Sequence, residues 1–536
     1  MTTDQHGHSV SNIGNSISRR VFPMRSGLST GTGALMAGTL ADAASEGNGP
    51  QLGRGAGKAT AGTGRKKKSG ETKTGYILGN ATIITVDPKR SIITDGAIAV
   101  KGSIIEAIGK TDELKEKYSS LTFHDMNDHI IMPGLINSHV HLTQALIKGC
   151  ADDVSLIEFL ANRVWRMMGD YNEEEGKASA DLCILEMITS GTTTFAETLL
   201  HSRYGLPGIT QAVVDSGMRG VLAKSVMDVG TYASRDNIMY KGMVENGDEC
   251  LKQAIEWKAK SENAGDGRIN IWLGPRPVGS TTKEMLEQVA KTAREHDMGI
   301  AIHFCEVKQD VELMRDVYHQ APGDFAESIG ILRDNTLLIH SVWLTDDDIR
   351  VIARNKANVA HCPASNSKLA SGFCRVPELL AAGVNVCLGT DAATCDNAHD
   401  MFDAMRLAAL IHKPRLLDPL LVPAETAIEM ATINGAKALK KDHLIGSLEV
   451  GKKADIITID FNHPRLVPNV NPVSAVVYSV KGSDVDNVII DGKWIVKDRK
   501  ILTMNQKAVM EKARKAIAQV LKKTGVENRS RWATGG

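Results

Sequence analysis

Aromatic residues, unbalanced charge and long apolar runs are all scarce in this sequence. Phe, Trp and Tyr make up 4% of the 536 residues, too few for the stacking platforms that bind single-stranded nucleic acids. Lys plus Arg and Asp plus Glu both number 63, so the positive net charge of a general nucleic-acid binder is missing. No continuous apolar stretch reaches the roughly 18 residues of a membrane span. We therefore expect a globular protein with no nucleic-acid partner and no membrane span.

Paired cysteines are missing as well. The eight cysteines are scattered along the chain and none forms a Cys-x-x-Cys pair, which argues against a zinc-ribbon site. Most lie in apolar runs, such as Cys387 in VNVCLGTD. We expect buried, reduced thiols, because a chain of this size needs no disulfide framework.

Residues 1–75 differ from the rest of the chain. They carry ten basic and four acidic residues and are rich in Gly, Ser, Thr and Ala, a composition that cannot bury enough apolar surface to fold. Within this leader, Ser18-Arg19-Arg20-Val21-Phe22 resembles the twin-arginine export motif, and the pattern Ala41-Asp42-Ala43 follows an uncharged stretch. Pro23-Met24 departs from that motif. We expect a disordered leader that directs export to the periplasm; the alternative is a cytoplasmic protein with a disordered tail.

Short strands are expected at both ends of the remaining chain. They are predicted at 76–86, 96–108, 129–132, 454–460, 485–490 and 493–496, with 96–108 forming two strands joined at Lys101-Gly102. We therefore expect residues 76–133 and 445–503 to form one composite β-sandwich domain. Residues 504–536 are expected to be a C-terminal helix, over 505–523, and a tail.

Residues 134–444 show another pattern, in which apolar strands alternate with helical runs such as 177–190 and 282–296. Alternation of this kind is typical of βα units around a parallel sheet. Eight candidate strands end near 139–141, 191–195, 220–226, 269–276, 300–306, 336–340, 358–363 and 384–391. Eight such units predict an α/β fold with a TIM (β/α)8 barrel, whose active site lies at the carboxyl ends of the strands.

Titratable side chains follow several of these strands at the point where each strand ends. His139 and His141 are two residues apart, so a strand places both imidazoles on one face. The other strand-end groups are His303, Glu306, His340 and Asp391. Any one of them could be an ordinary polar residue, but their joint placement in a barrel predicts a mononuclear divalent-metal site. Zn2+ is the expected ion, with Fe2+ or Mn2+ as alternatives, and it would lower the pKa of a bound water to about 7.

The same stretches resemble the aminohydrolase branch of the amidohydrolase superfamily, which includes methylthioadenosine/adenosylhomocysteine deaminase, guanine deaminase and triazine hydrolases. The matching segments are PGLINSHVHLTQALIKG from Pro133, SGTTTF from Ser190, HFCE from His303, HCPASNSKLASGF from His361, LGTDAATCDN from Leu388, NGAKAL from Asn434 and GSLEVGKKADIITID from Gly446. Together they span nearly everything from about 76 to 500. The resemblance implies a TIM barrel with a flanking β-sandwich, in agreement with the strand pattern.

The resemblance also implies a role for each strand-end residue. The metal ligands would be His139, His141, His303 and Asp391. Glu306 would carry a proton to the substrate, and His340 would orient or deprotonate the water, with Asp391 accepting its proton. Binuclear members use a carboxylated lysine at the end of strand four. Here that strand reads INIWLGPR and offers no lysine, whereas Lys224 lies on strand three, so a mononuclear site is expected.

The activity implied is hydrolytic deamination of an amino-substituted nitrogen heterocycle of the purine, pterin or triazine kind. A metal-bound hydroxide would attack the ring carbon and ammonia would leave. The enzyme would thus act on C–N bonds other than peptide bonds. One alternative is the same site expelling alkylamine or chloride from a triazine-like ring. Another is a non-catalytic scaffold, although such relatives usually lose metal ligands.

Two residues are candidates for substrate binding besides Glu306. Strand four ends Gly274-Pro275-Arg276-Pro277, where related deaminases often have Pro-His. Arg276 is expected either to bind an oxygenated or anionic heterocycle or to pair with a neighbouring acid. Phe159 is expected either to form an aromatic wall of the pocket or to pack in the core. A homo-oligomer is a further expectation, suggested by the C-terminal helix and the split β domain.

Overall fold

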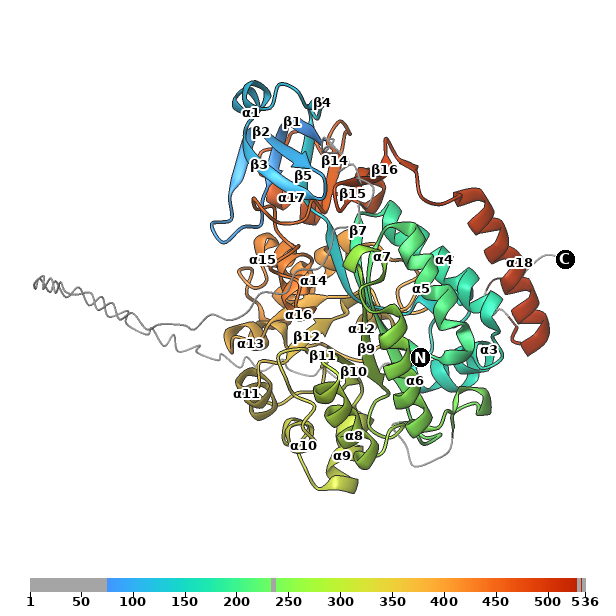
Figure 1. Cartoon of the computed structure of the whole chain (residues 1–536). Coiled ribbons are helices and arrows are strands. Elements are labelled where there is room, and N and C mark those ends of the chain that lie inside the picture. Colours follow the sequence, from blue (N-terminus) through green and yellow to red (C-terminus); the bar gives the residue numbers. More distant parts are fainter. Residues whose placement is uncertain (1–74, 233–237, 528–531, 533–536) are drawn as a thin grey trace, which may run out of the picture. The chain divides into compact units, whose positions relative to one another are not determined.

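The computed structural model describes residues 75–232, 238–527 and 532. The predicted leader, with its twin-arginine motif, lies outside the described residues. Residues 71–536 form one compact unit, which contains two sheets (Figure 1). One sheet is the parallel sheet of the barrel, and the other is a mixed sheet built from both flanks of the barrel.

The parallel sheet has eight strands in sequence order, and a bridge between Val140 and Asp391 joins its first strand to the segment after its last. The strands are β6 (Leu135–Val140), β7 (Thr192–Leu200), β8 (Arg219–Val226), β9 (Ile269–Pro275), β10 (Ile300–Phe304), β11 (Thr336–His340), β12 (Asn358–His361) and β13 (Val386–Leu388). Apolar side chains such as Ile136, Trp272 and Leu337 fill the interior. The barrel is therefore a packed core, and chemistry is confined to its ends.

Helices follow the strands and surround the barrel (Figure 1). The longer ones are α4 (Glu173–Thr189), α5 (Leu206–Ser216), α6 (Gly247–Ser261), α8 (Lys283–Glu295), α9 (Lys308–Tyr318), α11 (Asp346–Arg354) and α14 (Met401–Leu416). Shorter helices are α2 (Leu156–Phe159), α3 (Trp165–Met168), α7 (Ala264–Gly267), α10 (Pro322–Ser328), α12 (Pro363–Lys368), α13 (Val376–Ala381), α15 (Ala424–Met430) and α16 (Ile433–Ala438). Side-chain caps fix several starts: the Asn172 side chain accepts from the backbone N–H of Glu175, and Thr345 does the same for Asp348.

The second sheet has nine strands. Its members are β1 (Gly75–Ile84), β2 (Ile92–Lys101), β3 (Ile104–Lys110), β4 (Thr122–Asp125), β5 (His129–Pro133), β14 (Ile456–Asp460), β15 (Val485–Ile490), β16 (Lys493–Lys497) and β17 (Lys500–Ile501). Two helices lie within these flanks, α1 (Thr111–Lys117) and α17 (Pro472–Tyr478). The two halves meet where β5 pairs antiparallel with β14. The predicted fold class, a TIM barrel with a small β domain from both flanks, is confirmed, whereas α1 and β4 were not predicted.

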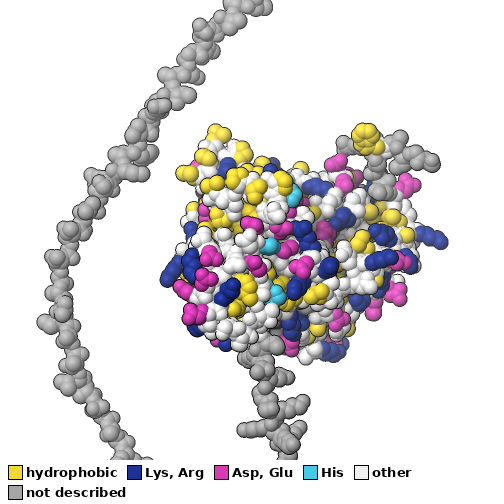
Figure 2. All heavy atoms as spheres, turned by 90° about the horizontal axis from the view of Figure 1, so that it is seen from above, with side chains coloured by type: hydrophobic (Ala, Val, Ile, Leu, Met, Phe, Trp, Pro, Cys, Tyr) yellow, Lys and Arg dark blue, Asp and Glu magenta, His cyan; other side chains and the backbone are white. Residues whose placement is uncertain are grey.

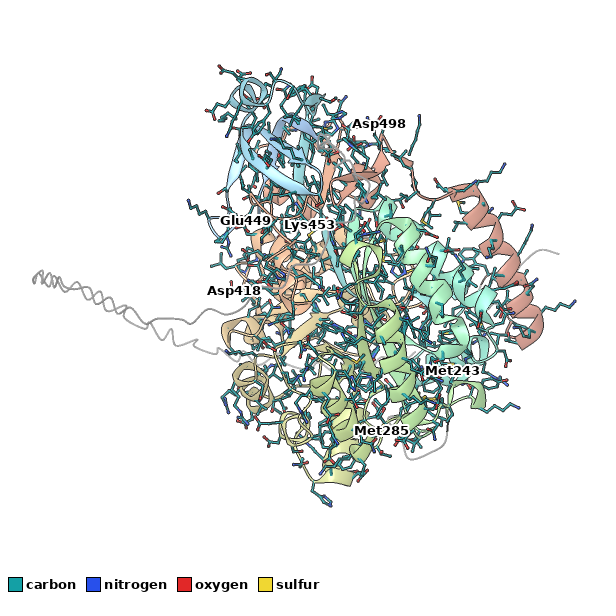
Figure 3. The ribbon with its side chains drawn as sticks, in the orientation of Figure 1. Met243, Met285, Asp418, Glu449, Lys453 and Asp498 are labelled. Atoms are coloured by element: carbon teal, nitrogen blue, oxygen red, sulfur yellow. The ribbon has the colours of Figure 1, made fainter. Side chains whose placement is uncertain are left out.

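A buried ion-pair cluster ties the start of β8 to this β domain. Arg219 donates to Asp455 at 2.6 and 3.1 Å and to Asp491 at 2.6 Å. Lys453, labelled in Figure 3, lies 3.2 Å from Asp491 as well. The cluster is at the amino ends of the strands, opposite the end where the predicted site lies.

The C-terminal helix α18 (Gln506–Thr524) packs against α4 of the same chain, and Lys523 pairs with Glu175 at 2.8 Å. The helix therefore has a partner within its own chain, and the homo-oligomer stays a prediction. On the face seen in Figure 2, basic and acidic side chains are interspersed. Within the described part of the chain, no helix combines the length and apolar character that a membrane crossing requires.

Candidate metal centre and active site

The predicted strand-end residues meet in one cavity at the carboxyl ends of the barrel strands. The cavity has about 590 Å³ of empty volume, and its lining includes His141, His303, Glu306, His340 and Asp391. Small-molecule sites are concave in this way and carry a few polar groups among apolar ones. Apolar side chains form much of the remaining wall, among them Trp165, Leu199 and Met243, the last of which is labelled in Figure 3.

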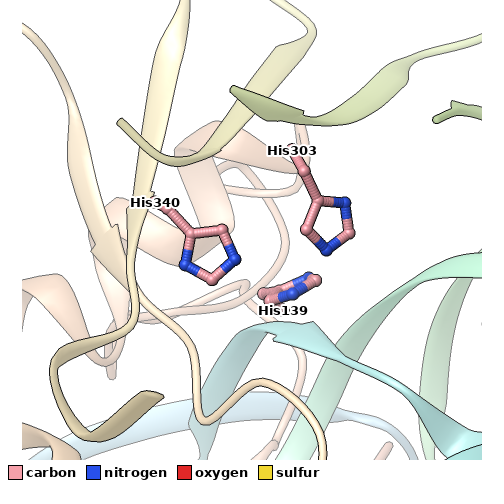
Figure 4. A group of neighbouring side chains, drawn as sticks. All are labelled: His139, His303 and His340. Carbon is pink, nitrogen blue, oxygen red and sulfur yellow. The ribbon is translucent and has the colours of Figure 1, made fainter. Parts of the chain in front are cut away.

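Imidazoles from three strands converge on one point, as Figure 4 shows for His139, His303 and His340. The ring centroid of His139 lies 4.9 Å from that of His303 and 5.6 Å from that of His340. His141 completes the group, with its ring stacked on His303 at 5.3 Å. One oxygen of Asp391, Oδ1, lies 3.2 Å from His139 Nε2 and 3.3 Å from His141 Nε2.

Burial favours the neutral forms of His139 and His303. It lowers the pKa of His139 and lowers that of His303 well below its usual value, and the neighbouring imidazoles lower the pKa of His303 further. Burial alone would raise the pKa of Asp391, but its close contact with His139, and then those with His340 and His141, outweigh burial and hold that pKa well below its usual range. The centre therefore presents unprotonated nitrogens around an ionised carboxylate, which is the donor set that Zn2+ and similar divalent ions prefer.

The residues present fit a metal ion. His139 Nε2 and His303 Nδ1 are buried without a hydrogen-bond partner, although unpaired buried polar atoms are costly. Among the described residues, two overlapping groups have ligand atoms within 4.8 Å of one another: His139, His303 and His340, and His139, His141 and Asp391. His139 belongs to both.

No lysine takes part in either group. The Lys224 ammonium contacts Glu245 at 3.2 Å and donates to the carbonyl oxygen of Ser225 at 2.7 Å. Lys224 thus pairs with Glu245 and is not part of the described cavity lining.

Neighbouring side chains hold the ligands in place. The other ring nitrogen of His139, Nδ1, lies 3.3 Å from Thr198 Oγ1. Ser365 donates to Asp391 Oδ2 at 2.6 Å, and His340 Nδ1 lies 2.9 Å from the side-chain oxygen of Asn366. Such partners fix the ring orientation and the tautomer of metal-binding histidines.

Two of the site residues have an unusual backbone conformation. His340 has φ 68° and Asp391 has φ 63°, the left-handed region that residues with a side chain adopt at a cost. In both cases the residue ends a barrel strand or follows it closely. The backbone turn at these positions directs the side chains toward the centre.

Glu306 faces the same point from the loop after β10. Its Oε2 lies 3.6 Å from His340 Nε2, and Ser371 donates to its Oε1 at 3.4 Å. The carboxylate of Asp310 accepts from the backbone N–H of Glu306 at 2.9 Å and so fixes the loop. Burial raises the pKa of Glu306 well above its usual value, and the charges of Asp391 and Asp310 raise it further. A carboxyl group of this kind can hold a proton near neutral pH and pass it on.

Both predicted substrate-binding residues line the cavity. Phe159 is 1% exposed, so it is at once part of the core and part of the cavity wall. Arg276 is 5% exposed, and no carboxylate of the described residues lies within ion-pair distance of it. Its Nη2 donates to His201 Nε2 at 3.1 Å.

Several supporting residues escaped the sequence analysis. Strand β7 was expected to end near Phe195 but continues to Leu200, so Thr198 and the neighbouring His201 were missed. His201 did carry a usable signal, since it is a titratable residue directly after an apolar strand. Asn366 and Ser365 lie in the segment from His361 that supported the family resemblance, but no spacing rule assigned them a role.

Comparison with known proteins agrees with this geometry. The sequence profile of the amidohydrolase family matches residues 130–495. A 5′-deoxyadenosine deaminase of Methanosarcina acetivorans is 34% identical over 445 residues, which are 83% of this chain and 98% of that protein. A 5-methylthioadenosine/S-adenosylhomocysteine deaminase of Moorella thermoacetica is 35% identical over 441 residues, 82% and 98% of the two chains. The crystal structure of an adenosine deaminase from Xanthomonas campestris with bound zinc has a TM-score of 0.76 at 28% identity, covering 83% of this chain and 98% of that one.

Proposed function

Because the chain belongs to the amidohydrolase family, we propose that it is a metal-dependent hydrolase that deaminates an amino-substituted nitrogen heterocycle. The observation that carries the proposal is the joint placement, in one cavity, of neutral imidazoles, the ionised Asp391 and the proton-holding Glu306. The names of the relatives support deamination.

The metal would be held by His139, His141, His303 and Asp391, and when bound it would supply a water of lowered pKa as the nucleophile. Zinc is the proposed ion, since a structural relative binds zinc and the donors are nitrogen and carboxylate oxygen. Fe2+ and Mn2+ suit the same donors and remain alternatives.

The chain's own residues would move the protons. Glu306 protonates the ring nitrogen next to the carbon under attack, so negative charge does not build up on the ring. His340, whose pKa burial lowers to about 4, is neutral and free to take a hydrogen bond from the water, while Asp391 accepts the proton. The C–N bond then breaks: the proton held by Asp391 passes to the amino group, which leaves as ammonia, and the remaining hydroxyl proton returns to Glu306 as the oxygen on the ring becomes a carbonyl. The buried apolar wall excludes bulk water from these steps.

Metal content and ammonia release test this proposal together. We expect purified protein to contain about one divalent ion per chain and to release ammonia from members of a purine, pterin and triazine panel. His303→Ala should lose both the ion and the activity, whereas His296→Ala, an exposed histidine at the end of α8, should keep both. A His303→Ala protein with full metal content and activity would show that the assigned centre is wrong.

Two other outcomes would favour the alternatives. If the protein releases alkylamine or chloride from a triazine ring and releases ammonia from no compound of the panel, a triazine-hydrolase function would be favoured. Metal-free protein that turns over nothing would favour a scaffold.

We further propose that the leader directs the folded enzyme to the periplasm, on the strength of its Arg19-Arg20 pair alone. Replacing both arginines with lysine keeps the charge but removes the feature that the export receptor reads. Cell fractionation should then move the enzyme from the periplasm to the cytoplasm. If the enzyme keeps the same distribution between periplasm and cytoplasm, the export role of the leader would be wrong.

A further inference from the structure

Arg276 is a buried cation whose charge no described residue neutralises directly. The side chain is 5% exposed and lines the cavity together with Glu306 and His340. Its Nε is buried without a hydrogen-bond partner. An unpaired donor on a buried guanidinium is costly, so the position is explained best if a ligand supplies the missing acceptor.

A chain of buried polar groups holds the guanidinium in place from behind. Arginine only donates hydrogen bonds, so His201 Nε2, 3.1 Å from Arg276 Nη2, must be the acceptor. The proton of this imidazole then sits on Nδ1, which lies 2.7 Å from Glu245 Oε2. Glu245 also contacts the Lys224 ammonium at 3.2 Å. His201 therefore orients Arg276 through Nη2, while Nε keeps no hydrogen-bond partner among the described residues.

Arg276 lies next to the metal centre. In the pairing of β9 with β10, Leu273 is opposite Ile300, and counting three residues onward along both strands places Arg276 level with His303. Neighbouring strands are about 4.8 Å apart. A planar ring bound at the metal centre can thus reach the guanidinium with another part of its edge.

The remaining wall suits a flat ring better than a sugar. The Arg276 guanidinium lies 5.8 Å from the ring of Trp165, and Phe159, Leu199 and Met243 add apolar surface. Gln144 is a polar side chain of the described lining, but its Oε1 already accepts from Thr394 at 2.8 Å. Away from Glu306 and Asp391, the described part of this wall would offer the hydroxyl groups of a ribose few acceptors.

We propose that Arg276 determines substrate specificity by donating to a carbonyl or anionic oxygen on the ring, and that the substrate class is a free amino-oxo heterocycle rather than a nucleoside. His201 is a positioning residue for Arg276. This inference rests on the proposed deaminase function. It deepens that function by naming a substrate class that differs from the adenosine-type nucleosides in the names of the relatives.

Matched pairs of substrates that differ by one oxo group on the ring test the proposal. Guanine and 2-aminopurine share the 2-amino group, and isoguanine and adenine share the 6-amino group. Charge-assisted hydrogen bonds of this kind correspond to about ten- to hundredfold in affinity. We expect kcat/KM to favour the oxo member of at least one pair by that factor, and free bases to be preferred to adenosine.

Variants assign the preference to a residue. Arg276→Gln should abolish it while the metal content stays unchanged, and Arg276→Lys should keep part of it. Arg294→Gln, an exposed arginine on α8, is the matched control and should behave as wild type. His201→Phe should raise KM for the oxo member with little change in kcat, and His201→Gln, which keeps an acceptor, should restore KM.

A binding experiment separates this inference from the proposed function. Hypoxanthine and purine differ by one oxo group on the ring and carry no amino group, so calorimetry measures their affinity without turnover. If wild type binds hypoxanthine more tightly than purine and Arg276→Gln does not, the inference is supported. That support stands even if no panel member releases ammonia, a result that would overturn the deaminase function alone. Ammonia release with equal rates for both members of every pair, or a preference for adenosine, overturns the inference and leaves the deaminase function standing. Equal affinity for hypoxanthine and purine, or binding of neither, also overturns it.

Discussion

The hydrogen bond behind His139 gives a sharp prediction about metal affinity. Thr198 is fully buried on β7, with its Oγ1 3.3 Å from His139 Nδ1. When Nε2 faces an ion, Nδ1 carries the proton and Thr198 is its acceptor. Thr198→Val keeps the shape and removes that acceptor. Loss of such a partner typically weakens metal binding by 10- to 100-fold, or about 1.4 to 2.8 kcal/mol.

The same strand supplies the control. Thr194 is also buried on β7, but its Oγ1 has no hydrogen-bond partner, so Thr194→Val removes no contact and should bind metal as wild type does. Competition with a chromogenic chelator measures the dissociation constant of each variant. Equal affinities for Thr198→Val and Thr194→Val would refute the view that Thr198 holds His139 in its ligand tautomer.

Three more perturbations test other parts of the structure. Arg219→Met leaves the buried Asp455 and Asp491 carboxylates without their main partner. It should lower the free energy of unfolding, measured in urea, by about 3 to 5 kcal/mol and leave the metal content of the folded protein unchanged. A loss of less than about 1 kcal/mol would contradict this. Gly389→Ala would place a Cβ 2.6 Å from the Cβ of His139, so metal content by elemental analysis should fall, and full occupancy would count against the packing described. Burial, helped by nearby carboxylates, raises the pKa of Asp396 to about 7. Since the unfolded group ionises near 4, stability should fall as pH rises from about 4 to 7, by up to about 1.4 kcal/mol per pH unit. Asp396→Asn should flatten that slope in denaturation curves.

The sequence alone predicts the barrel and its central residues well. Apolar runs alternate with helical runs in 134–444, and a parallel barrel brings the ends of all its strands to one place. His139, His303 and Asp391 are far apart in sequence, yet this topology alone implies that they meet. The structure brings them together: His303 and Asp391 line one cavity with Glu306 and His340, and His139 clusters with them.

The supporting contacts could not be predicted in the same way. Thr198 lies in TTTFAETLL, where polar residues interrupt the apolar pattern and hide the true length of β7. Asn366 reaches His340 from a six-residue helix, and His201, directly after β7, meets Glu245, which lies just before α6. Such pairs depend on side-chain direction and on the backbone turns at strand ends, and neither follows from periodicity. The charged stretch that forms α1 and β4 was missed because it has no clear apolar period.

The pairing of β5 with β14 has a consequence for how the polypeptide is completed during synthesis. Pro133 is opposite Ile456 across this pair, so the whole barrel is an insertion into a sheet whose two halves are made more than 300 residues apart. By the time Asp391 has left the ribosome every proposed ligand of the centre is present, but β5 still has an open edge until the last segment arrives. Open edges invite association with other chains. A transcript cut short after the barrel would therefore yield a protein with its full set of ligands and a strong tendency to aggregate.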